Sequence, residues 1–130
     1  MSSLDEQFNK RKPLYLQIKE KIEDQIIKGQ LKEHDQIPST TEMVNFFKVN
    51  HITAARGVNL LVEEGTIYKK RGIGMFVAGG ARDKLLQRRK DDFLDRYLKP
   101  LLKEANKLGL TDKELISLIK QLKEGDLNGI

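Results

Sequence analysis

Hydrophobic residues recur with helical spacing near the start of the chain. Four of them follow one another at intervals of four residues: Leu14, Ile18, Ile22 and Ile26. Pro13 suits the first position of a helix, and Lys28 and Gly29 suit its end. The spacing therefore predicts a helix over residues 13–28 that buries this stripe.

Two shorter helices are predicted next. The motif S-T-T-E, which begins at Ser39, predicts a capping box with Glu42, and Asn50 suits the N-cap of the second helix. The first of these helices carries apolar residues for one buried stripe: Met43, Val44, Phe46 and Phe47. The second carries a longer apolar set: Ile52, Ala55, Val58, Leu60, Leu61 and Val62. Gly65 is expected to follow the end of this second helix.

Two short strand-like runs, residues 66–68 and 75–77, come after these helices. The turn between them contains three cationic residues and two glycines: Lys69, Lys70, Arg71, Gly72 and Gly74. Runs of this kind around a glycine-containing turn predict a β-hairpin. A helix, a short turn, a second helix and a basic hairpin in this order indicate a winged helix-turn-helix.

The glycine pair at residues 79–80 is a hinge-like break, after which the sequence predicts a long helix over residues 81–108. Pro100 is expected to kink or divide this helix near Leu98, because proline interrupts helical hydrogen bonding. Thr111 begins a second capping box, T-D-K-E, and with it a last helix.

These elements predict a mainly α fold with a small β-wing. Three parts are expected: a flexible N-terminal arm, residues 1–12; a winged helix-turn-helix domain, residues 13–79; and a helical dimerisation region, residues 80–130.

The helical region is too small to enclose a core of its own, yet it displays many large apolar side chains. The residues expected to pair are Phe93, Leu94, Tyr97, Leu98, Leu101, Leu115, Ile119 and Leu122. A second copy related by a two-fold axis is the simplest partner, which predicts a homodimer. The alternative is a monomer whose helices fold back onto the winged domain.

The amino-acid composition excludes several classes of protein and of site. The chain has no cysteine, which excludes disulfides and thiolate metal sites and fits a cytoplasmic location. No apolar run approaches the length of a membrane span. Two isolated histidines and no phosphate-binding glycine loop leave no catalytic constellation, so we expect neither an enzyme nor a cofactor nor a metal site.

The formal net charge of +5 and the isoelectric point near 9.4 mildly favour an anionic partner. Residues 1–80 carry 12 basic and 10 acidic residues, and residues 81–130 carry 12 and 9. The positive charge is therefore not concentrated in the winged domain, and the placement of individual side chains must decide what binds there.

That placement favours double-stranded DNA. The first turn of the second short helix offers Asn50, His51 and Thr53, with Arg56 one turn further along, and such groups can reach base edges in the major groove. The cationic hairpin suits phosphates, and the free amides at the start of the Ser39 helix can receive one. Each residue alone also has an ordinary explanation, as a cap or a solvated charge. Their order within about forty residues makes DNA the favoured partner.

The same residues resemble the DNA-binding domain of GntR-family bacterial transcription regulators. The resemblance is carried by Pro13-Leu14-Tyr15, Gln17-Ile18, Ile27-x-Gly29-x-Leu31, Asp35-x-Ile37-Pro38-Ser39, Val49-Asn50-x-x-Thr53, Glu64-Gly65 and Arg71-Gly72-x-Gly74-x-Phe76-Val77. The Val-Asn pair and the short C-terminal region look most like the YtrA-type subfamily. This resemblance implies a compact dimeric repressor, often of neighbouring transporter genes. In a dimer, two recognition helices one DNA turn apart would read a pseudo-palindromic operator.

Carried over by position, the resemblance assigns operator contacts to Ser39, Asn50, His51, Thr53, Arg56, Arg71 and Gly72. Thr41 stands where many members have an arginine, so one contact with DNA is expected to be weaker or absent. His34 replaces the usual glycine of a turn, and histidine tolerates the positive φ required there. Gly57 replaces a common alanine and is expected to loosen its helix by about 1 kcal/mol.

Other partners stay open on the sequence alone. A winged helix can dock an acidic protein instead of DNA, and specific duplex binding would distinguish the two. RNA is less favoured, because the aromatic residues fall in apolar stripes. A small-molecule effector between the C-terminal helices, near Phe93, Arg96 or Tyr97, is a weak hypothesis, since these residues suit an interface core equally well.

Overall fold

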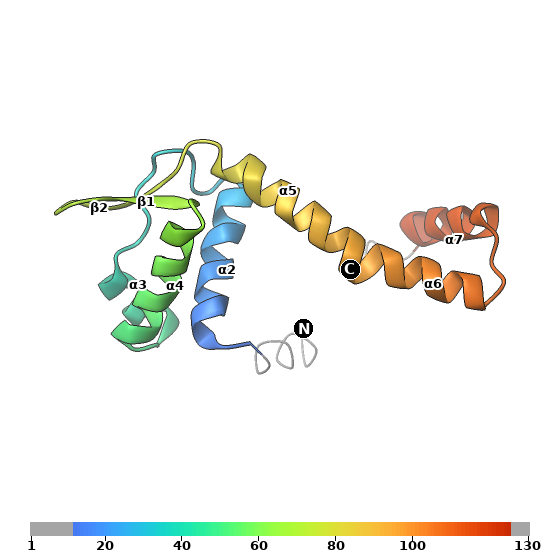
Figure 1. The fold of residues 1–130 in the computed structure, drawn as a ribbon, viewed down its shortest axis with the longest axis horizontal. Helices are drawn as coiled ribbons and strands as arrows, with labels where there is room; N and C mark the ends of the chain where they lie inside the picture. Colours follow the sequence, from blue (N-terminus) through green and yellow to red (C-terminus); the bar gives the residue numbers. More distant parts are fainter. Residues whose placement is uncertain (1–11, 126–130) are drawn as a thin grey trace. The chain divides into compact units, whose positions relative to one another are not determined.

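The structure, a computed structural model, describes residues 12–125. Its elements in chain order are α2 (Leu14–Ile27), α3 (Thr40–Phe47), α4 (His51–Glu63), β1 (Ile67–Lys70), β2 (Gly74–Val77), α5 (Ala81–Phe93), the π-helical turn η1 (Leu94–Leu98), α6 (Lys99–Lys107) and α7 (Asp112–Gly125) (Figure 1). The prediction of a mainly α fold with a small β-wing is confirmed. The flexible arm predicted over residues 1–12 lies outside the described residues except for Lys12, whose ammonium pairs with Glu20 at 3.0 Å.

The chain divides into two compact units after Gln87. We call the first the winged-helix unit and residues 88–130 the C-terminal unit. Ala81 and Leu85 of α5 belong to the hydrophobic core of the winged-helix unit. This unit therefore includes the first turns of α5, and the boundary between the two functional regions at residue 79 stays a prediction.

The core of the winged-helix unit forms where α2 packs along α4. Ile18, Ile22 and Ile26 are buried, as the spacing predicted, together with Leu61 of α4. Leu14 does not join them, because 55% of its surface is exposed. At this first turn of α2 the neighbouring residue Tyr15 meets α4 instead, so the predicted stripe is one residue too long.

The two short helices bury narrower faces than predicted. In α4 the buried residues follow i, i+3, i+4, i+7 spacing: Ala54, Gly57, Val58 and Leu61. Ile52 falls outside this phase and is 80% exposed, and Phe46 of α3 is 79% exposed while Met43 is buried. Assigning these two residues to the apolar sides of their helices was wrong, because hydrophobicity does not override the helical phase set by the core.

Gly57 lies where α2 and α4 approach most closely. A Cβ atom added at this position would lie 2.7 Å from the backbone oxygen of Tyr15 and 3.3 Å from the side chain of Ile18. The glycine costs some helix propensity, as the sequence indicated, but it also allows the two helices to pack at this distance.

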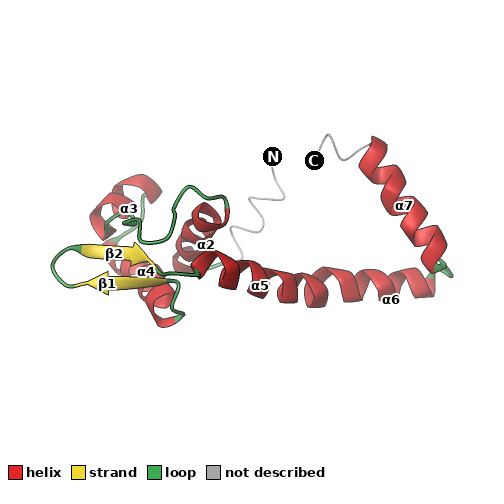
Figure 2. Ribbon diagram, turned by 90° about the horizontal axis from the view of Figure 1, so that it is seen from above, coloured by secondary structure: helices red, strands yellow, loops and turns green. Residues whose placement is uncertain are grey.

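The wing is the antiparallel hairpin of β1 and β2 together with the turn between them (Figure 2). Ile67 pairs with Val77 and Lys70 with Gly74, so the strands extend slightly further into the turn than predicted. The loop before α3 runs beside β2. His34 N–H donates to Val77 O at 2.8 Å, and Ile37 N–H donates to Met75 O at 2.9 Å. His34 has a φ of 67°, which confirms that histidine holds the turn in which the resemblance expected glycine.

The long C-terminal helix runs through α5, η1 and α6 without a gap, and its hydrogen-bond pattern changes near Leu98, where Pro100 was expected to kink or divide it. The backbone N–H of Lys99 donates to Leu94 O, five residues earlier, which is the π-helical pattern. Proline cannot donate a backbone hydrogen bond, so the turn before it is where the regular helix gives way. The second predicted capping box is also present, since Glu114 N–H donates to Thr111 Oγ1 at 3.1 Å and Thr111 N–H donates to Glu114 Oε1 at 3.0 Å.

Candidate nucleic-acid interface

The N-terminal turn of α4 presents polar side chains to solvent. Asn50 caps the helix, because its Oδ1 accepts a hydrogen bond from Thr53 N–H at 2.8 Å. That bond uses the side-chain oxygen, so the NH₂ group of Asn50 is the part that can face a ligand. His51 is exposed and Thr53 is half-buried. Capping is therefore confirmed as one role of Asn50, and the turn offers hydrogen-bonding groups beside it.

Arg56 lies one turn further along α4 and does not extend freely into solvent. Its guanidinium carbon is 3.8 Å from the centre of the Tyr15 ring, in a cation–π contact with α2. The ring contact favours this orientation of the guanidinium, whose N–H groups remain donors. Sequence reasoning missed this role of Tyr15, because the two residues lie 41 positions apart and only packing brings them together.

The start of α3 holds the capping box predicted from S-T-T-E. Glu42 N–H donates to Ser39 Oγ at 3.1 Å, and Ser39 N–H donates to Glu42 Oε1 at 2.9 Å. These bonds hold the pKa of the Glu42 carboxyl below its ordinary value, with the backbone bond from Ser39 as the larger cause. Thr41 is exposed in the same turn. The capping box uses the amides of Ser39 and Glu42, so a phosphate at this helix end would meet those of Thr40 and Thr41.

The tip of the wing is basic and fixed by a contact from the loop before α3. Lys70 Nζ lies 4.8 Å from the centre of the Phe76 ring, and Arg71 is exposed beside Gly72, whose φ is 77°. Gln36 Nε2 donates to the backbone oxygen of Ile73 at 3.1 Å. Sequence reasoning missed Gln36, which lies in a loop with no periodic pattern and acts only through the fold.

Gly74 provides the space for that contact. A Cβ atom added to Gly74 would collide with the side-chain amide of Gln36, and the φ of 149° at Gly74 is itself unfavourable for other residues. A second contact joins the same loop to the wing: His34 Nδ1 and Tyr68 Oη lie 2.9 Å apart, and the Tyr68 ring stacks on that of Phe76. The wing is therefore attached to the loop before α3 along most of its length.

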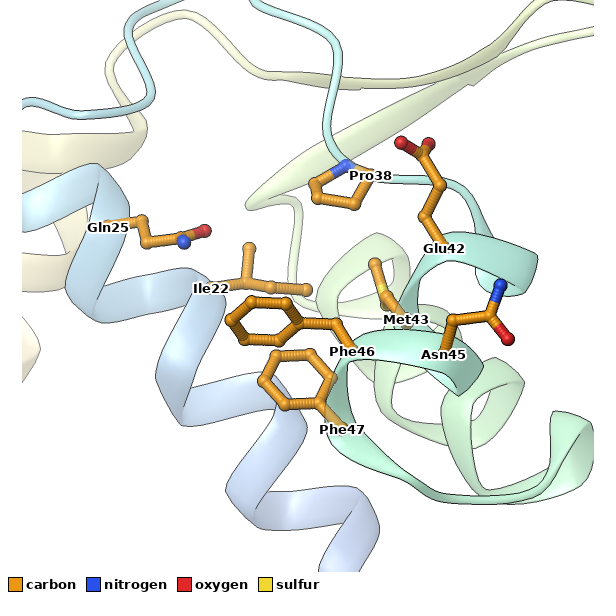
Figure 3. A pocket seen from close by; sticks show the side chains of 8 residues that line it. All are labelled: Ile22, Gln25, Pro38, Glu42, Met43, Asn45, Phe46 and Phe47. Atoms are coloured by element: carbon orange, nitrogen blue, oxygen red, sulfur yellow. The ribbon is translucent and has the colours of Figure 1, made fainter.

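A groove of about 520 Å³ opens between α2 and α3 (Figure 3). Its lining is mostly apolar with a polar rim and consists of Ile22, Gln25, Pro38, Glu42, Met43, Asn45, Phe46 and Phe47. The rings of Phe46 and Phe47 meet edge to face, with centres 5.0 Å apart. This groove lies in the winged-helix unit, whereas the effector site near Phe93, Arg96 and Tyr97 was predicted in the C-terminal unit and stays a prediction.

The C-terminal unit leaves its apolar side chains uncovered. Six of the eight residues predicted to pair are exposed: Phe93, Leu94, Tyr97, Leu101, Ile119 and Leu122. Leu98 and Leu115 are half-buried, and Ala105 is the single buried residue among those described in this unit. Ion pairs between neighbouring turns, such as Lys99 with Asp95 at 2.7 Å, occupy polar positions of the same helices.

No helix within residues 12–125 is both long and apolar enough to cross a membrane.

Comparison with known proteins places this arrangement in a family. The sequence model described as "Bacterial regulatory proteins, gntR family" matches residues 14–77. The chain is 34% identical to the HTH-type transcriptional regulator YhcF of Bacillus subtilis over 94% of its own length and 99% of that protein. The chain belongs to the gntR family. It is also 28% identical to the HTH-type transcriptional repressor YtrA of Bacillus subtilis, over 90% of this chain and 88% of YtrA.

Two solved structures share the fold. A GntR-family transcriptional regulator from Bacteroides thetaiotaomicron is 35% identical and superposes with a TM-score of 0.72, covering 85% of this chain and 96% of that one. The DNA-binding domain of AraR in complex with operator ORE1 is 34% identical, with a TM-score of 0.50, over 52% of this chain and 82% of that one. The chain is thus a transcription regulator whose winged-helix unit matches one that binds operator DNA.

Proposed function

We propose that the chain is a homodimeric repressor that binds a pseudo-palindromic operator through the N-terminal turn of α4 and through the wing. The observation that carries the proposal is the exposed, polar N-terminal turn of α4 in the same compact unit as the basic wing. An α-helix fits the major groove, and cationic side chains on a hairpin suit the flanking phosphates.

The proposed contacts fall into two classes. The N-cap and the first turns of α4 supply the residues that reach base edges, which are Asn50, His51, Thr53 and Arg56. The residues that hold the DNA backbone are Ser39, Thr41, Lys70, Arg71 and Gly72. The first class is supported by side-chain hydrogen-bonding groups at the helix start. The second class is supported by exposed cations, by the glycine at the wing tip and by the helix N-terminus of α3.

The homodimer is supported by the uncovered apolar side chains of the C-terminal unit. A second copy buries the same face on both partners, and two recognition helices then meet two half-sites of the DNA. The resemblance to YtrA-type regulators favours transporter genes near its own gene as targets. A cytoplasmic location follows from DNA as the partner.

Fluorescence anisotropy tests the proposal. Purified protein is titrated onto duplex fragments from the region upstream of its own gene and onto scrambled duplexes, each over a series of salt concentrations. We expect one fragment to bind far more tightly than the scrambled duplexes, with affinity falling steeply as salt rises. Equally weak binding to all fragments would contradict the proposal and favour a winged helix that docks a protein.

The backbone contacts have a separate test. The double variant Lys70→Ala/Arg71→Ala is expected to bind every duplex more weakly and to show a shallower dependence of log affinity on log salt, by about 0.9 per lost phosphate contact. Lys113→Ala/Lys120→Ala, which removes two exposed cations from α7, is the matched control. An unchanged slope in the wing variant would remove the wing from the phosphates.

A further inference from the structure

Ile52 is a large apolar side chain exposed on the helix that the proposed function directs into the major groove. It is 80% exposed, the largest exposed fraction among the large hydrophobic residues of the described chain. Its neighbours along the helix are the polar residues His51 and Thr53. The buried residues of α4 lie on a different face, so the core does not explain why this position is apolar.

An apolar side chain has few suitable contacts among the base edges of the major groove. Of the four bases, only thymine presents a methyl group in the major groove; the other base edges there carry hydrogen-bond donors and acceptors. An isoleucine placed against those polar groups would remove water from them without offering a hydrogen bond, which is unfavourable. Against a methyl group the same side chain loses nothing and buries apolar surface.

We propose that Ile52 contacts the C5-methyl group of a thymine in each operator half-site and so determines the base at that position. The inference rests on the proposed function, since it requires α4 in the major groove. It adds an apolar contact to the polar ones assigned to Asn50, His51, Thr53 and Arg56. The methyl group of a thymine at one position of each half-site then contributes to affinity.

Replacing thymine by deoxyuridine removes that methyl group and leaves the Watson–Crick pairing intact. We would take the fragment that the protein binds most tightly and replace its thymines one position at a time, symmetrically in both half-sites. Wild-type affinity should fall about fourfold per half-site at one position, the factor expected for burying one methyl group. Ile52→Ala should bind the thymine duplex more weakly and should lose most of the response to deoxyuridine at that position, because its shorter side chain buries less of the methyl group.

Two variants serve as controls. Ile52→Val keeps a branched apolar side chain and should retain most of the response, whereas Phe46→Ala removes an exposed apolar residue of α3 and should leave the response unchanged. Thermal melting should show that Ile52→Ala is folded, because the side chain is exposed and alanine favours helix.

The outcomes separate this inference from the proposed function. Equal deoxyuridine responses in wild type and Ile52→Ala, or no response at any position, would overturn the role of Ile52 while specific binding stands. Wild-type protein that binds specific and scrambled duplexes equally would overturn the proposed function and this inference with it. The inference is supported if Ile52→Ala loses most of the deoxyuridine response while the wild type and Phe46→Ala keep it.

Discussion

Arg56 connects packing within the winged-helix unit to the proposed reading of DNA. Its guanidinium lies over the Tyr15 ring, which limits the orientations that the side chain samples before DNA arrives. Fixing a long side chain in advance reduces the entropy lost on binding. Tyr15 is therefore expected to matter for affinity even though it lies on α2 and not on the recognition helix.

Arg56→Ala is expected to weaken specific binding by about 1–3 kcal/mol, because a base-edge contact of arginine is lost. Tyr15→Leu should weaken the same binding less, by removing the cation–π contact, while Tyr15→Phe keeps the ring and should bind like the wild type. Anisotropy against the specific and scrambled duplexes measures both effects. Unchanged affinity of Arg56→Ala would exclude Arg56 from the interface.

For single residues, the sequence predicted those interactions that join residues close together in the chain. The caps by Ser39, Asn50 and Thr111 were recognisable because donor and acceptor lie three residues apart. Exposure depends instead on which phase of a helix meets the core, and here grouping by hydrophobicity misplaced Phe46 and Ile52. The spacing of Ala54, Gly57, Val58 and Leu61 was present in the sequence and would have identified Ile52 as lying outside the buried face.

The carboxylate of Glu42 belongs to the capping box at the N-terminus of α3, so its ionisation affects how well that helix end is capped. Hydrogen bonds from Ser39 lower the pKa of Glu42 in the folded state. Because the pKa of Glu42 is lower in the folded state, its ionised form stabilises the fold. This stabilisation is fully present above the ordinary pKa of 4.5 and is lost as the pH falls through the folded-state pKa. Acid therefore weakens the capping box before it affects the apolar core.

The variant Glu42→Gln tests this coupling. Glutamine keeps an oxygen that can accept the bond from Ser39 N–H but has no charge to titrate. Its melting temperature should lie below that of the wild type near neutral pH and approach it as the pH falls through the folded-state pKa of Glu42. Circular dichroism melts across this range measure the difference, and two parallel curves would show that Glu42 does not contribute to the acid dependence.

The wing has a defined position because Gln36 and Gly74 fit together. Gln36→Ala removes the hydrogen bond to Ile73 O, an interaction of about 0.5–1.5 kcal/mol, and should weaken DNA binding by up to about tenfold if a mobile wing tip holds phosphates poorly. The same substitution in the Lys70→Ala/Arg71→Ala background should have little further effect, because the cations that it positions are absent. If anisotropy shows that the losses of affinity add up, Gln36 does not act by positioning Lys70 and Arg71.

Element types followed from the sequence more readily than contacts between elements. Turn residues and strand-like runs were enough to predict the hairpin, and Pro100 was enough to predict where the long helix changes. The attachment of the wing through His34, Gln36 and Tyr68 was not predictable, because it joins a loop to a hairpin about thirty to forty residues later. Gly57 is similar: its cost to α4 was visible in the sequence, while the close approach of α2 was not.

The oligomeric state of the whole molecule depends on the C-terminal unit, whose large apolar side chains are mostly exposed. Tyr97→Glu/Leu101→Glu is expected to prevent dimerisation, since a carboxylate buried in an apolar interface is unfavourable. Operator affinity should then fall about a hundredfold or more, because two linked half-site contacts become separate events. Sedimentation measures the mass, and Lys103→Glu/Lys107→Glu on exposed polar positions of α6 is the control. A double variant that remains dimeric would place the interface elsewhere.

Selection of bound duplexes from a randomised pool, followed by sequencing, tests the central claim most directly. A dimer that reads DNA with two copies of α4 should enrich two inverted half-sites whose centres lie one helical turn, about 10 base pairs, or a whole multiple of it apart. Enrichment of a single unrepeated half-site would contradict the dimer. A pool that shows no enriched sequence would contradict sequence-specific binding itself.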